Sequence, residues 1–214
     1  AQIGWRVDTI AGGYKSWRAL VVKQLYDTPV ASPVVVLDGN TGTAKTAILH
    51  LLAAQGMQVI DLEGLAGHRG SLFGHTAGGQ PSQKAFECAL AMELSRLDPT
   101  RPVVVEAESA KVGNLRLPTQ LWAAMGKAPR VAIEASLPER ARYLSRAYAD
   151  IVADQARLLA VLGLLRHAHA AETITAWESL ALSGQFEALA HNLMERHYDP
   201  RYEKHRARMA HAQE

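Results

Sequence analysis

The chain has 214 residues, of which 48% are hydrophobic and 21% are charged, a composition typical of an ordinary soluble globular protein. Its formal net charge of +2 is too small to favour any class of partner. The single cysteine, Cys88, excludes an internal disulfide bond and is typical of a reducing compartment. No apolar stretch approaches the roughly 20 residues of a membrane-spanning helix, so we expect a cytoplasmic protein with no membrane partner.

The first 27 residues differ in pattern from the rest. The stretch GWRVDTIAGGYKSWRALVVKQLY is typical of a short strand, a turn at two glycines and the start of a helix. The next stretch, DTPVASP, contains two prolines among small residues and indicates a linker. We therefore expect a separate first segment over residues 1–27.

From Val34 onward, short apolar runs alternate with amphipathic stretches. The runs VVVL, MQVIDL, PVVVEAE and RVAIEA predict four strands, and the all-apolar ones are typical of parallel strands buried on both faces. Helices are predicted at Lys45 to Gln55 and over SQKAFECALAMELSRL. This alternation predicts an α/β core over residues 28–136, in which a parallel sheet is flanked by helices.

The remainder of the chain, residues 137–214, has helical patterns only. It predicts an all-helical C-terminal part with helices at 140–153, 155–169, 171–183 and 186–197.

The sequence GNTGTAKT at residues 39–46 lies between the first core strand and the first core helix. It meets the phosphate-loop pattern G-x-x-x-x-G-K-[ST], except that Ala44 stands where the pattern has glycine. The extra methyl group is tolerable if the φ angle of Ala44 is negative. The core is therefore predicted to be P-loop NTPase-like, with a phosphate-binding loop formed by Gly39, Asn40, Thr41, Gly42, Thr43, Ala44, Lys45 and Thr46.

Such a loop implies roles for its last two residues. Backbone amides and Lys45 would neutralise a diphosphate, and the Thr46 hydroxyl would hold Mg²⁺. An acidic residue at the end of a neighbouring buried strand would assist as a catalytic group. Asp61 and Glu106 are the first candidates, followed by Glu108 and Glu63.

Further polar groups cluster near the predicted carboxyl ends of the strands, where an open α/β sheet places its ligands. They occur in DLEGLAGHRGSLFG, GGQPSQKAFE, VEAESAKVGNLRLP and LMERHYDPRYEKHR. The candidates for binding substrate or nucleic acid are His68, Arg69, Ser71, Gln80, Gln83, Lys84, Glu108, Arg140 and Tyr198.

Together these segments resemble one bacterial family, the tRNA 2-selenouridine synthases, also called tRNA geranyl-2-thiouridine synthases. The shared motifs are GNTGTAKT, DLEGLAGHRGSLFG, QPSQKAFE, VVVEAESAKVGNLRLP and HYDPRY, and they extend over nearly the whole chain. GWRVDTIAGGYKSWR resembles the end of the rhodanese domain that precedes the phosphate-loop domain in this family. The body of that domain, with its active-site cysteine, is missing from this sequence, and Ala44 departs from the glycine usual in the family.

The resemblance implies a transferase that converts 2-thiouridine at the tRNA wobble position to 2-selenouridine through geranyl-2-thiouridine. Geranyl diphosphate and selenophosphate would be its co-substrates, with Mg²⁺ at the phosphate loop. The partners would be the tRNA anticodon arm and a rhodanese domain supplied in cis or in trans. The geranyl tail would need an apolar channel, for which Leu158, Leu159, Leu162, Leu164, Leu165 and Trp177 are available unless they form the helical core.

Two other interpretations of the sequence stay open. The phosphate loop also suits an ATP- or GTP-binding, kinase-like protein, since fold alone does not select the ligand. Alternatively, the chain could be a non-catalytic module that docks tRNA for a separate rhodanese domain. In that case Lys45 would be needed for affinity and not for a chemical step.

Overall fold

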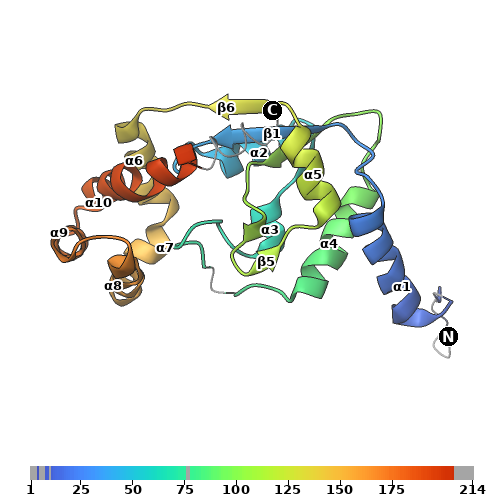
Figure 1. Cartoon of the computed structure of the whole chain (residues 1–214), viewed down its shortest axis with the longest axis horizontal. Helices are drawn as coiled ribbons and strands as arrows, with labels where there is room; N and C mark the ends of the chain where they lie inside the picture. Colours follow the sequence, from blue (N-terminus) through green and yellow to red (C-terminus); the bar gives the residue numbers. More distant parts are fainter. Residues whose placement is uncertain (1–3, 5–7, 10, 76–77, 205–214) are drawn as a thin grey trace.

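The computed structural model describes residues 4, 8–9, 11–75 and 78–204. At its centre is a four-stranded parallel sheet with the strand order β2-β3-β1-β6, formed by β1 (Val34–Gly39), β2 (Gln58–Ile60), β3 (Val103–Glu106) and β6 (Arg130–Ile133). Val34 lies opposite Val103 and Leu37 opposite Glu106. The predicted parallel α/β sheet is confirmed, and Figure 1 shows it between flanking helices.

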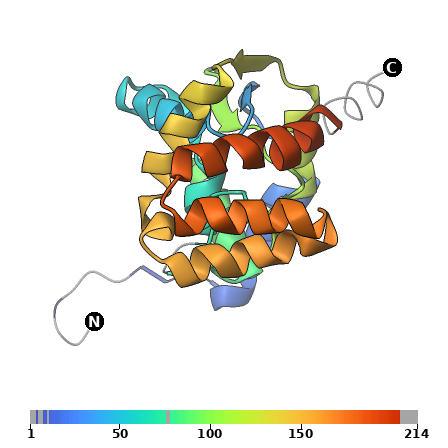
Figure 2. The same ribbon diagram turned by 90° about the vertical axis from the view of Figure 1, so that its left-hand side faces the viewer.

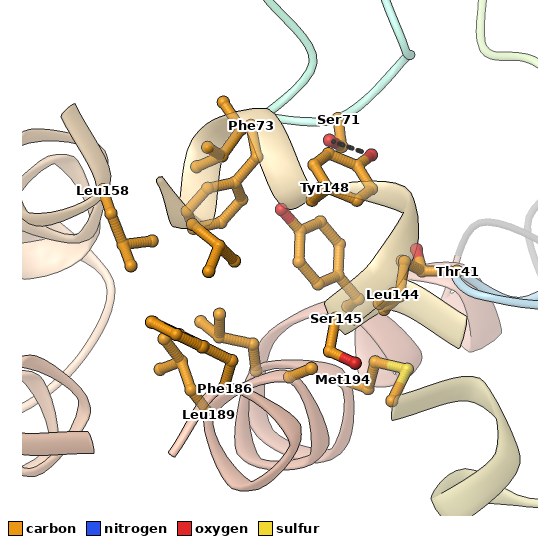
Figure 3. A pocket seen from close by; sticks show the side chains of 15 residues that line it. Thr41, Ser71, Phe73, Leu144, Ser145, Tyr148, Leu158, Phe186, Leu189 and Met194 are labelled. Atoms are coloured by element: carbon orange, nitrogen blue, oxygen red, sulfur yellow. Dashed lines mark hydrogen bonds between the residues drawn. The ribbon is translucent and has the colours of Figure 1, made fainter. Parts of the chain in front are cut away.

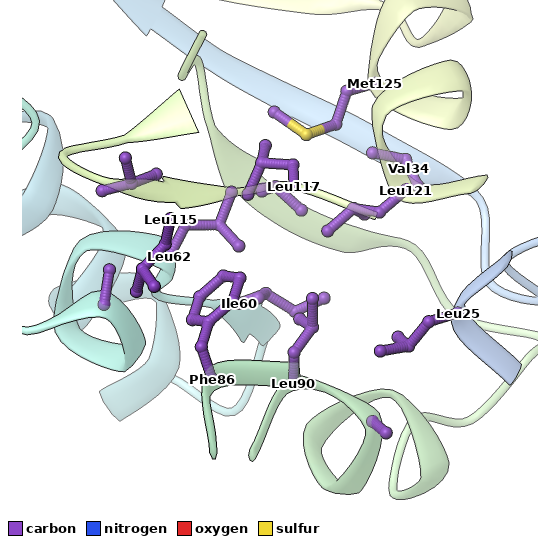
Figure 4. Close-up of a cluster of buried hydrophobic side chains, with 14 of the residues drawn as sticks. Leu25, Val34, Ile60, Leu62, Phe86, Leu90, Leu115, Leu117, Leu121 and Met125 are labelled. Carbon is purple, nitrogen blue, oxygen red and sulfur yellow. The ribbon is translucent and has the colours of Figure 1, made fainter. Parts of the chain in front are cut away.

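Alternate residues of the central strands point to opposite faces of the sheet, as the pleat requires. On one face, Val36, Val103 and Val105 pack in a large core with the helices α4 (Gln83–Ser95) and α5 (Thr119–Lys127). Figure 4 shows other members of this core, among them Phe86 of α4 and Leu121 of α5. On the other face, Val104 packs against α2 (Lys45–Ala54). Both faces are therefore covered, which explains the uninterrupted apolar runs in the sequence.

The segment before the sheet is a helix, α1 (Gly13–Val22), that continues as one π-helical turn, Lys23–Asp27. Its residues Val21 and Leu25 are buried in the same core as the strands. The strand expected at the beginning of this segment lies largely outside the described residues, so the predicted boundary at residue 27 stays a prediction.

Several short elements have no counterpart among the predictions. Between the strands lie α3 (Leu62–Ala66), a hairpin of β4 (Lys111–Val112) and β5 (Leu115–Arg116), and α5. The hairpin and α3 are too short for a hydrophobic period to reveal them. Helix α5 begins after Pro118 and buries only Leu121 and Met125, so its apolar signal is weak.

The C-terminal part is helical, as predicted, and Figure 2 shows α8, α9 and α10 stacked side by side. Two predicted helices are each divided. Residues 140–153 belong to α6 (Leu137–Ala147) and α7 (Ala149–Val152), and residues 155–169 to α8 (Gln155–Gly163) and a 3₁₀ turn (Leu164–His167). The last helices are α9 (Ala171–Leu182) and α10 (Phe186–Leu193), followed by a π-helical turn, Met194–Tyr198.

Helix α6 begins at Leu137, earlier than the start predicted at residue 140. The Ser136 hydroxyl accepts a hydrogen bond from the Glu139 amide, and Pro138 occupies the first turn, where its missing N–H is harmless. Loop residue Phe73 also packs in the core of the C-terminal helices, so the segment 61–74 connects the sheet to the helical part.

Candidate functional site

The phosphate loop has the architecture that its sequence predicts. Strand β1 ends at Gly39, the loop turns over residues 40–44, and α2 begins at Lys45. The Lys45 ammonium donates to the carbonyl oxygen of Gly39 at 2.8 Å and lies 5.9 Å from the centre of the Tyr202 ring. The lysine is therefore folded onto its own loop, where a phosphate oxygen can replace the carbonyl as its partner.

The condition under which the extra methyl group of Ala44 is tolerated without strain, a negative φ angle, is not met. Ala44 has a φ of 60° and a ψ of 29°, and it is the one non-glycine residue with a positive φ among the described residues. The loop keeps the left-handed conformation that glycine supplies in the pattern, and the alanine adopts it at a cost of about 1–2 kcal/mol. Ala44 is the N-cap residue of α2, and its carbonyl oxygen accepts the amide of Ile48 at 3.0 Å.

Arg140 supports the loop from the helical part of the chain. It forms a two-pronged ion pair with Asp199, at 2.9 and 2.7 Å, and also donates to the carbonyl oxygen of Thr41 at 3.2 Å. Gly42 lies so close that a Cβ there would be 3.0 Å from the Arg140 carbonyl oxygen. The side chain of Arg140 is only 7% exposed, so its predicted contact with tRNA stays a prediction and its visible role is structural.

Three carboxylates converge beside the loop. Glu63 lies in α3, Glu106 ends β3, and Glu108 follows two residues later, and one oxygen from each lies within 4.8 Å of the others. The Thr46 hydroxyl donates to Glu63 Oε2 at 3.2 Å. Burial, and then repulsion between the carboxylates, raises the pKa of Glu63 and of Glu108, and burial also raises the pKa of Glu106.

Of the two first candidates among the acidic residues, Glu106 lies in this cluster and Asp61 does not, whereas the next candidates, Glu108 and Glu63, both do. Asp61 Oδ1 accepts the amide of Gly64 at 2.7 Å and caps α3, and its Oδ2 lies 2.7 Å from His50 Nε2. Glu63 takes the place next to Thr46 because the cap starts a helix that directs residue 63 toward the loop. Three carboxylates and a hydroxyl form an oxygen-only donor set, which fits a hard divalent cation such as Mg²⁺.

The loop before Phe73 supplies another wall of the site. Arg69 pairs with Asp150 at 2.9 Å and lies over the Tyr148 ring, 5.0 Å from its centre. The hydroxyls of Ser71 and Tyr148 are 3.1 Å apart. His68 is buried, forms a β-bridge with His75, and has its pKa lowered by burial. Arg69 and Ser71 thus line the site as expected, whereas His68 lies in the interior.

Gln80 and Gln83 hold the β4–β5 hairpin. The Gln80 amide group donates to the Val112 carbonyl at 3.0 Å and accepts from the Asn114 amide at 2.8 Å. Gln83 exchanges two hydrogen bonds of 2.9 Å with the backbone of Arg116. The hydrogen bonds to the hairpin account for the positions of both glutamine side chains. Their predicted contact with substrate stays a prediction. Lys84 is exposed on α4.

Two adjoining recesses open at the loop. The first, about 850 Å³ with its mouth included, is polar and is lined by the phosphate loop, the three glutamates, Arg69 and Tyr202. The second, about 570 Å³ with its mouth included, is apolar and lies between α6, α7, α8 and α10 (Figure 3). Both are lined by four residues in common, Thr41, Ser71, Leu144 and Tyr148.

Most of the six residues offered for an apolar channel form the helical core, the other interpretation of their pattern. Leu162, Leu165 and Trp177 are fully buried there and Leu159 packs against it, Leu164 is 57% exposed, and only Leu158 lines the apolar recess. The lining comes mainly from Phe73, Ile151, Phe186, Leu189 and Tyr198. Tyr198 was predicted to contact substrate or tRNA, and the structure places it in this wall, where burial raises its pKa.

Comparison with known proteins now decides the family. A family model described as the tRNA 2-selenouridine synthase AAA domain matches residues 32–163, more than half of the chain. The chain belongs to the tRNA 2-selenouridine synthase family. The resemblance seen in the motifs is thereby confirmed, and the phosphate loop, the carboxylates and all of α8 lie inside the matched region.

Members of the family match beyond this region. A tRNA 2-selenouridine synthase of Alcanivorax borkumensis is 33% identical over 94% of this chain and 62% of its own length. One from Pseudomonas syringae pv. tomato is 41% identical over 67% of this chain and 38% of its own length. The chain therefore spans less than two thirds of these relatives.

A solved structure, TT1252 from Thermus thermophilus, is also similar. It is 20% identical, with a TM-score of 0.35 over 57% of this chain and 78% of that one, and a likeness this weak carries no argument.

Among the described residues, every helix is too short or too polar to cross a bilayer.

Proposed function

We propose that this chain is the phosphate-loop part of a tRNA-modifying transferase that makes 2-selenouridine from wobble 2-thiouridine through geranyl-2-thiouridine. Family membership and the names of the relatives support the tRNA-modifying role. In this proposal, the phosphate loop holds geranyl diphosphate.

The observation that carries the choice of ligand is the junction of the two recesses. The polar recess at the phosphate loop adjoins the apolar recess, and both are lined by Thr41, Ser71, Leu144 and Tyr148. A ligand that fits both must have a diphosphate at one end and an apolar tail at the other. A nucleotide fits less well, because a nucleobase needs several hydrogen-bonding groups and the second recess is lined mainly by aliphatic and aromatic side chains.

The chain's own residues then have defined roles in prenyl transfer. The sulfur of 2-thiouridine attacks C1 of the geranyl group, the C1–O bond breaks, diphosphate leaves, and the proton on N3 of the base is lost. Lys45 and the loop amides stabilise the charge that develops on the leaving diphosphate. The apolar recess orients the tail and excludes water from the reactive allylic carbon.

Mg²⁺ fits this site as a charge-neutralising ion. Thr46 and the carboxylates of Glu63, Glu106 and Glu108 would hold it, and it would supply electrostatic stabilisation of the leaving diphosphate.

A third recess is the proposed entrance for tRNA. It is lined by Ser109, Arg130, Arg201 and Tyr202, and it meets the phosphate-loop recess at Gly70, Glu108 and Tyr202. The two arginines of its lining suit a phosphate backbone, and Arg130 is paired with Asp38 of the same recess at 3.0 Å. The later step, in which selenium from selenophosphate replaces the geranylated sulfur, is proposed to need the cysteine of a rhodanese domain, in cis or in trans.

The test is to incubate the chain with 2-thiouridine tRNA, geranyl diphosphate and Mg²⁺, and to analyse the nucleosides by mass spectrometry. We expect geranyl-2-thiouridine from the wild type and a loss of at least about a hundredfold in Lys45→Ala, the scale of removing one charge-stabilising group. Lys23→Ala, which removes an exposed lysine far from the loop in sequence, is the control.

If Lys45→Ala transferred geranyl as fast as Lys23→Ala, the proposal would be wrong. No product with tRNA still bound would favour a docking module. Hydrolysis of ATP or GTP that depends on Lys45 would favour a nucleotide-binding protein.

A further inference from the structure

The three glutamates beside the phosphate loop form an unusual charge cluster. Glu63 comes from α3, whereas Glu106 and Glu108 come from the end of β3 and the residues after it, and their oxygens approach within 4.8 Å. Parallel pairing places Glu106 opposite Leu37, so this carboxylate lies next to the strand that leads into the phosphate loop. Close approach of three like charges is unfavourable unless something neutralises them.

Glu106 gives an independent indication that a ligand is missing from the cluster. Its side chain is 1% exposed, and its Oε1 has no hydrogen-bond partner in the described part of the chain. A buried oxygen of an acidic group that is left without a partner is expensive, and native proteins seldom retain one without a ligand or function.

The neighbouring cations do not neutralise the cluster. Arg69 is paired with Asp150, and Arg140 is paired with Asp199. Lys45 is near enough to lower the pKa of Glu106, but its ammonium donates to the Gly39 carbonyl. When all three carboxylates are ionised, their net charge with one lysine nearby is about −2. A single divalent cation balances this charge and takes the place of the protons that the raised pKa values of Glu63 and Glu108 favour.

We propose that Glu63, Glu106, Glu108 and the Thr46 hydroxyl bind one divalent cation in the free protein, before any phosphate ligand enters. Oxygen-only coordination selects Mg²⁺ or Mn²⁺ over softer metals. In P-loop NTPases one hydroxyl and one acidic residue hold Mg²⁺, and the phosphates of the ligand supply further coordination. Here three carboxylates supply the charge, so the protein alone retains the cation.

The proposal sets an order of binding for the site. The cation neutralises the glutamates first, and a diphosphate then enters a recess that is no longer strongly negative. This order does not depend on whether the ligand is geranyl diphosphate or a nucleotide.

The test is a titration of the intact chain with Mn²⁺ alone, without phosphate or diphosphate, followed by electron paramagnetic resonance of free Mn²⁺. We expect one site per chain, competition by Mg²⁺, and a concentration-dependent rise in melting temperature. Glu106→Gln is nearly the same size and should weaken Mn²⁺ binding by about tenfold or more. Glu93→Gln is the matched control, since Glu93 is a partly exposed glutamate of α4 that pairs with Arg96 outside the triad.

Failure of the wild type to bind Mn²⁺ without diphosphate would overturn the proposal, whatever the folding of the variants. Equal weakening by Glu93→Gln and Glu106→Gln would also overturn it, because it would place the ion outside the triad. If Mn²⁺ bound but no geranyl group were transferred, the proposed cation site would stand. Only the proposed ligand of the phosphate loop, geranyl diphosphate, would then be rejected.

Discussion

At the scale of single residues, the phosphate loop keeps its shape although one of its pattern residues is replaced. Ala44 has the left-handed backbone conformation that glycine adopts without strain, and it is followed directly by Lys45. Strain of this kind persists where the surrounding structure determines the conformation, and here both the preceding strand and the following helix do so.

The strain at Ala44 leads to a stability prediction. Ala44→Gly should raise the free energy of unfolding by about 0.5–1 kcal/mol, because relief of the left-handed strain exceeds the added flexibility of the unfolded chain. Urea unfolding would measure it. Ala47→Gly, at an exposed position within α2, is the control and should lower stability by up to about 1 kcal/mol. A loss of stability in both variants would contradict the prediction.

A buried histidine near the C-terminal end makes stability depend on pH. His197 is 3% exposed, its Nδ1 lies 2.9 Å from His169 Nε2, and burial, followed by the charge of Arg201, lowers its pKa to about 4. In the unfolded chain its pKa is about 6.5, so the unfolded state binds more protons between these values. The contribution of neutral His197 is complete above pH 6.5 and is lost as pH falls toward 4.

The corresponding measurement compares urea unfolding of the wild type and His197→Gln between pH 7 and pH 4. The wild type should lose up to about 1.4 kcal/mol per pH unit more than the variant over this window. The glutamates with raised pKa values act in the opposite direction, but their effect is common to both proteins and cancels in the difference. If the unfolding free energies of the two proteins changed with pH in parallel, His197 would not contribute to the pH dependence of stability.

At the scale of elements, the C-terminal segment and α6 are joined to the phosphate loop by one buried ion pair. Arg140 contacts Asp199 twice and the Thr41 carbonyl once. The helical part therefore does more than bury its own core, since it also supports the loop from outside the sheet.

Loss of this pair should be costly. Asp199→Asn leaves a guanidinium that is 7% exposed without its counter-charge, so we expect a loss of about 3 kcal/mol in unfolding free energy. The matched control is Glu139→Gln, which breaks the exposed pair with Arg142 in the same helix and should cost less than about 1 kcal/mol. Chemical denaturation measures both, and equal effects would contradict a structural role for Asp199.

At the scale of the whole molecule, the two recesses meet because the α/β core and the helices share one wall. The phosphate loop belongs to the core, whereas the apolar lining comes from α6, α7, α8 and α10 and from Phe73. The proposed specificity for a prenyl diphosphate is thus a property of the junction and belongs to neither part alone.

Filling the apolar recess should separate the two proposed contacts of geranyl diphosphate, that of its apolar tail and that of its diphosphate. Ser145 is partly buried and lines the recess (Figure 3), so Ser145→Phe should raise the KM for geranyl diphosphate by about tenfold or more through steric exclusion. Binding of inorganic diphosphate, measured by calorimetry, should be unchanged because the phosphate loop is untouched. Unchanged KM would place the tail elsewhere, and weakened diphosphate binding would indicate a disturbed loop.

The sequence alone determined the parallel sheet, the phosphate loop and the family, because each is encoded by residues close together in the chain. VVVL and PVVVEAE are buried on both faces, and GNTGTAKT is one turn between a strand and a helix. Local periodicity and short motifs are sufficient for features of this kind.

Only the tertiary structure decided which side chains meet. Helix capping by Asp61 brought Glu63 to Thr46, the C-terminal segment provided a partner for Arg140, and Gln80 and Gln83 proved to hold a hairpin. The apolar recess formed between helices whose own leucines are mostly buried in their core. Such contacts depend on the packing of elements distant in sequence, and no single stretch of residues encodes them.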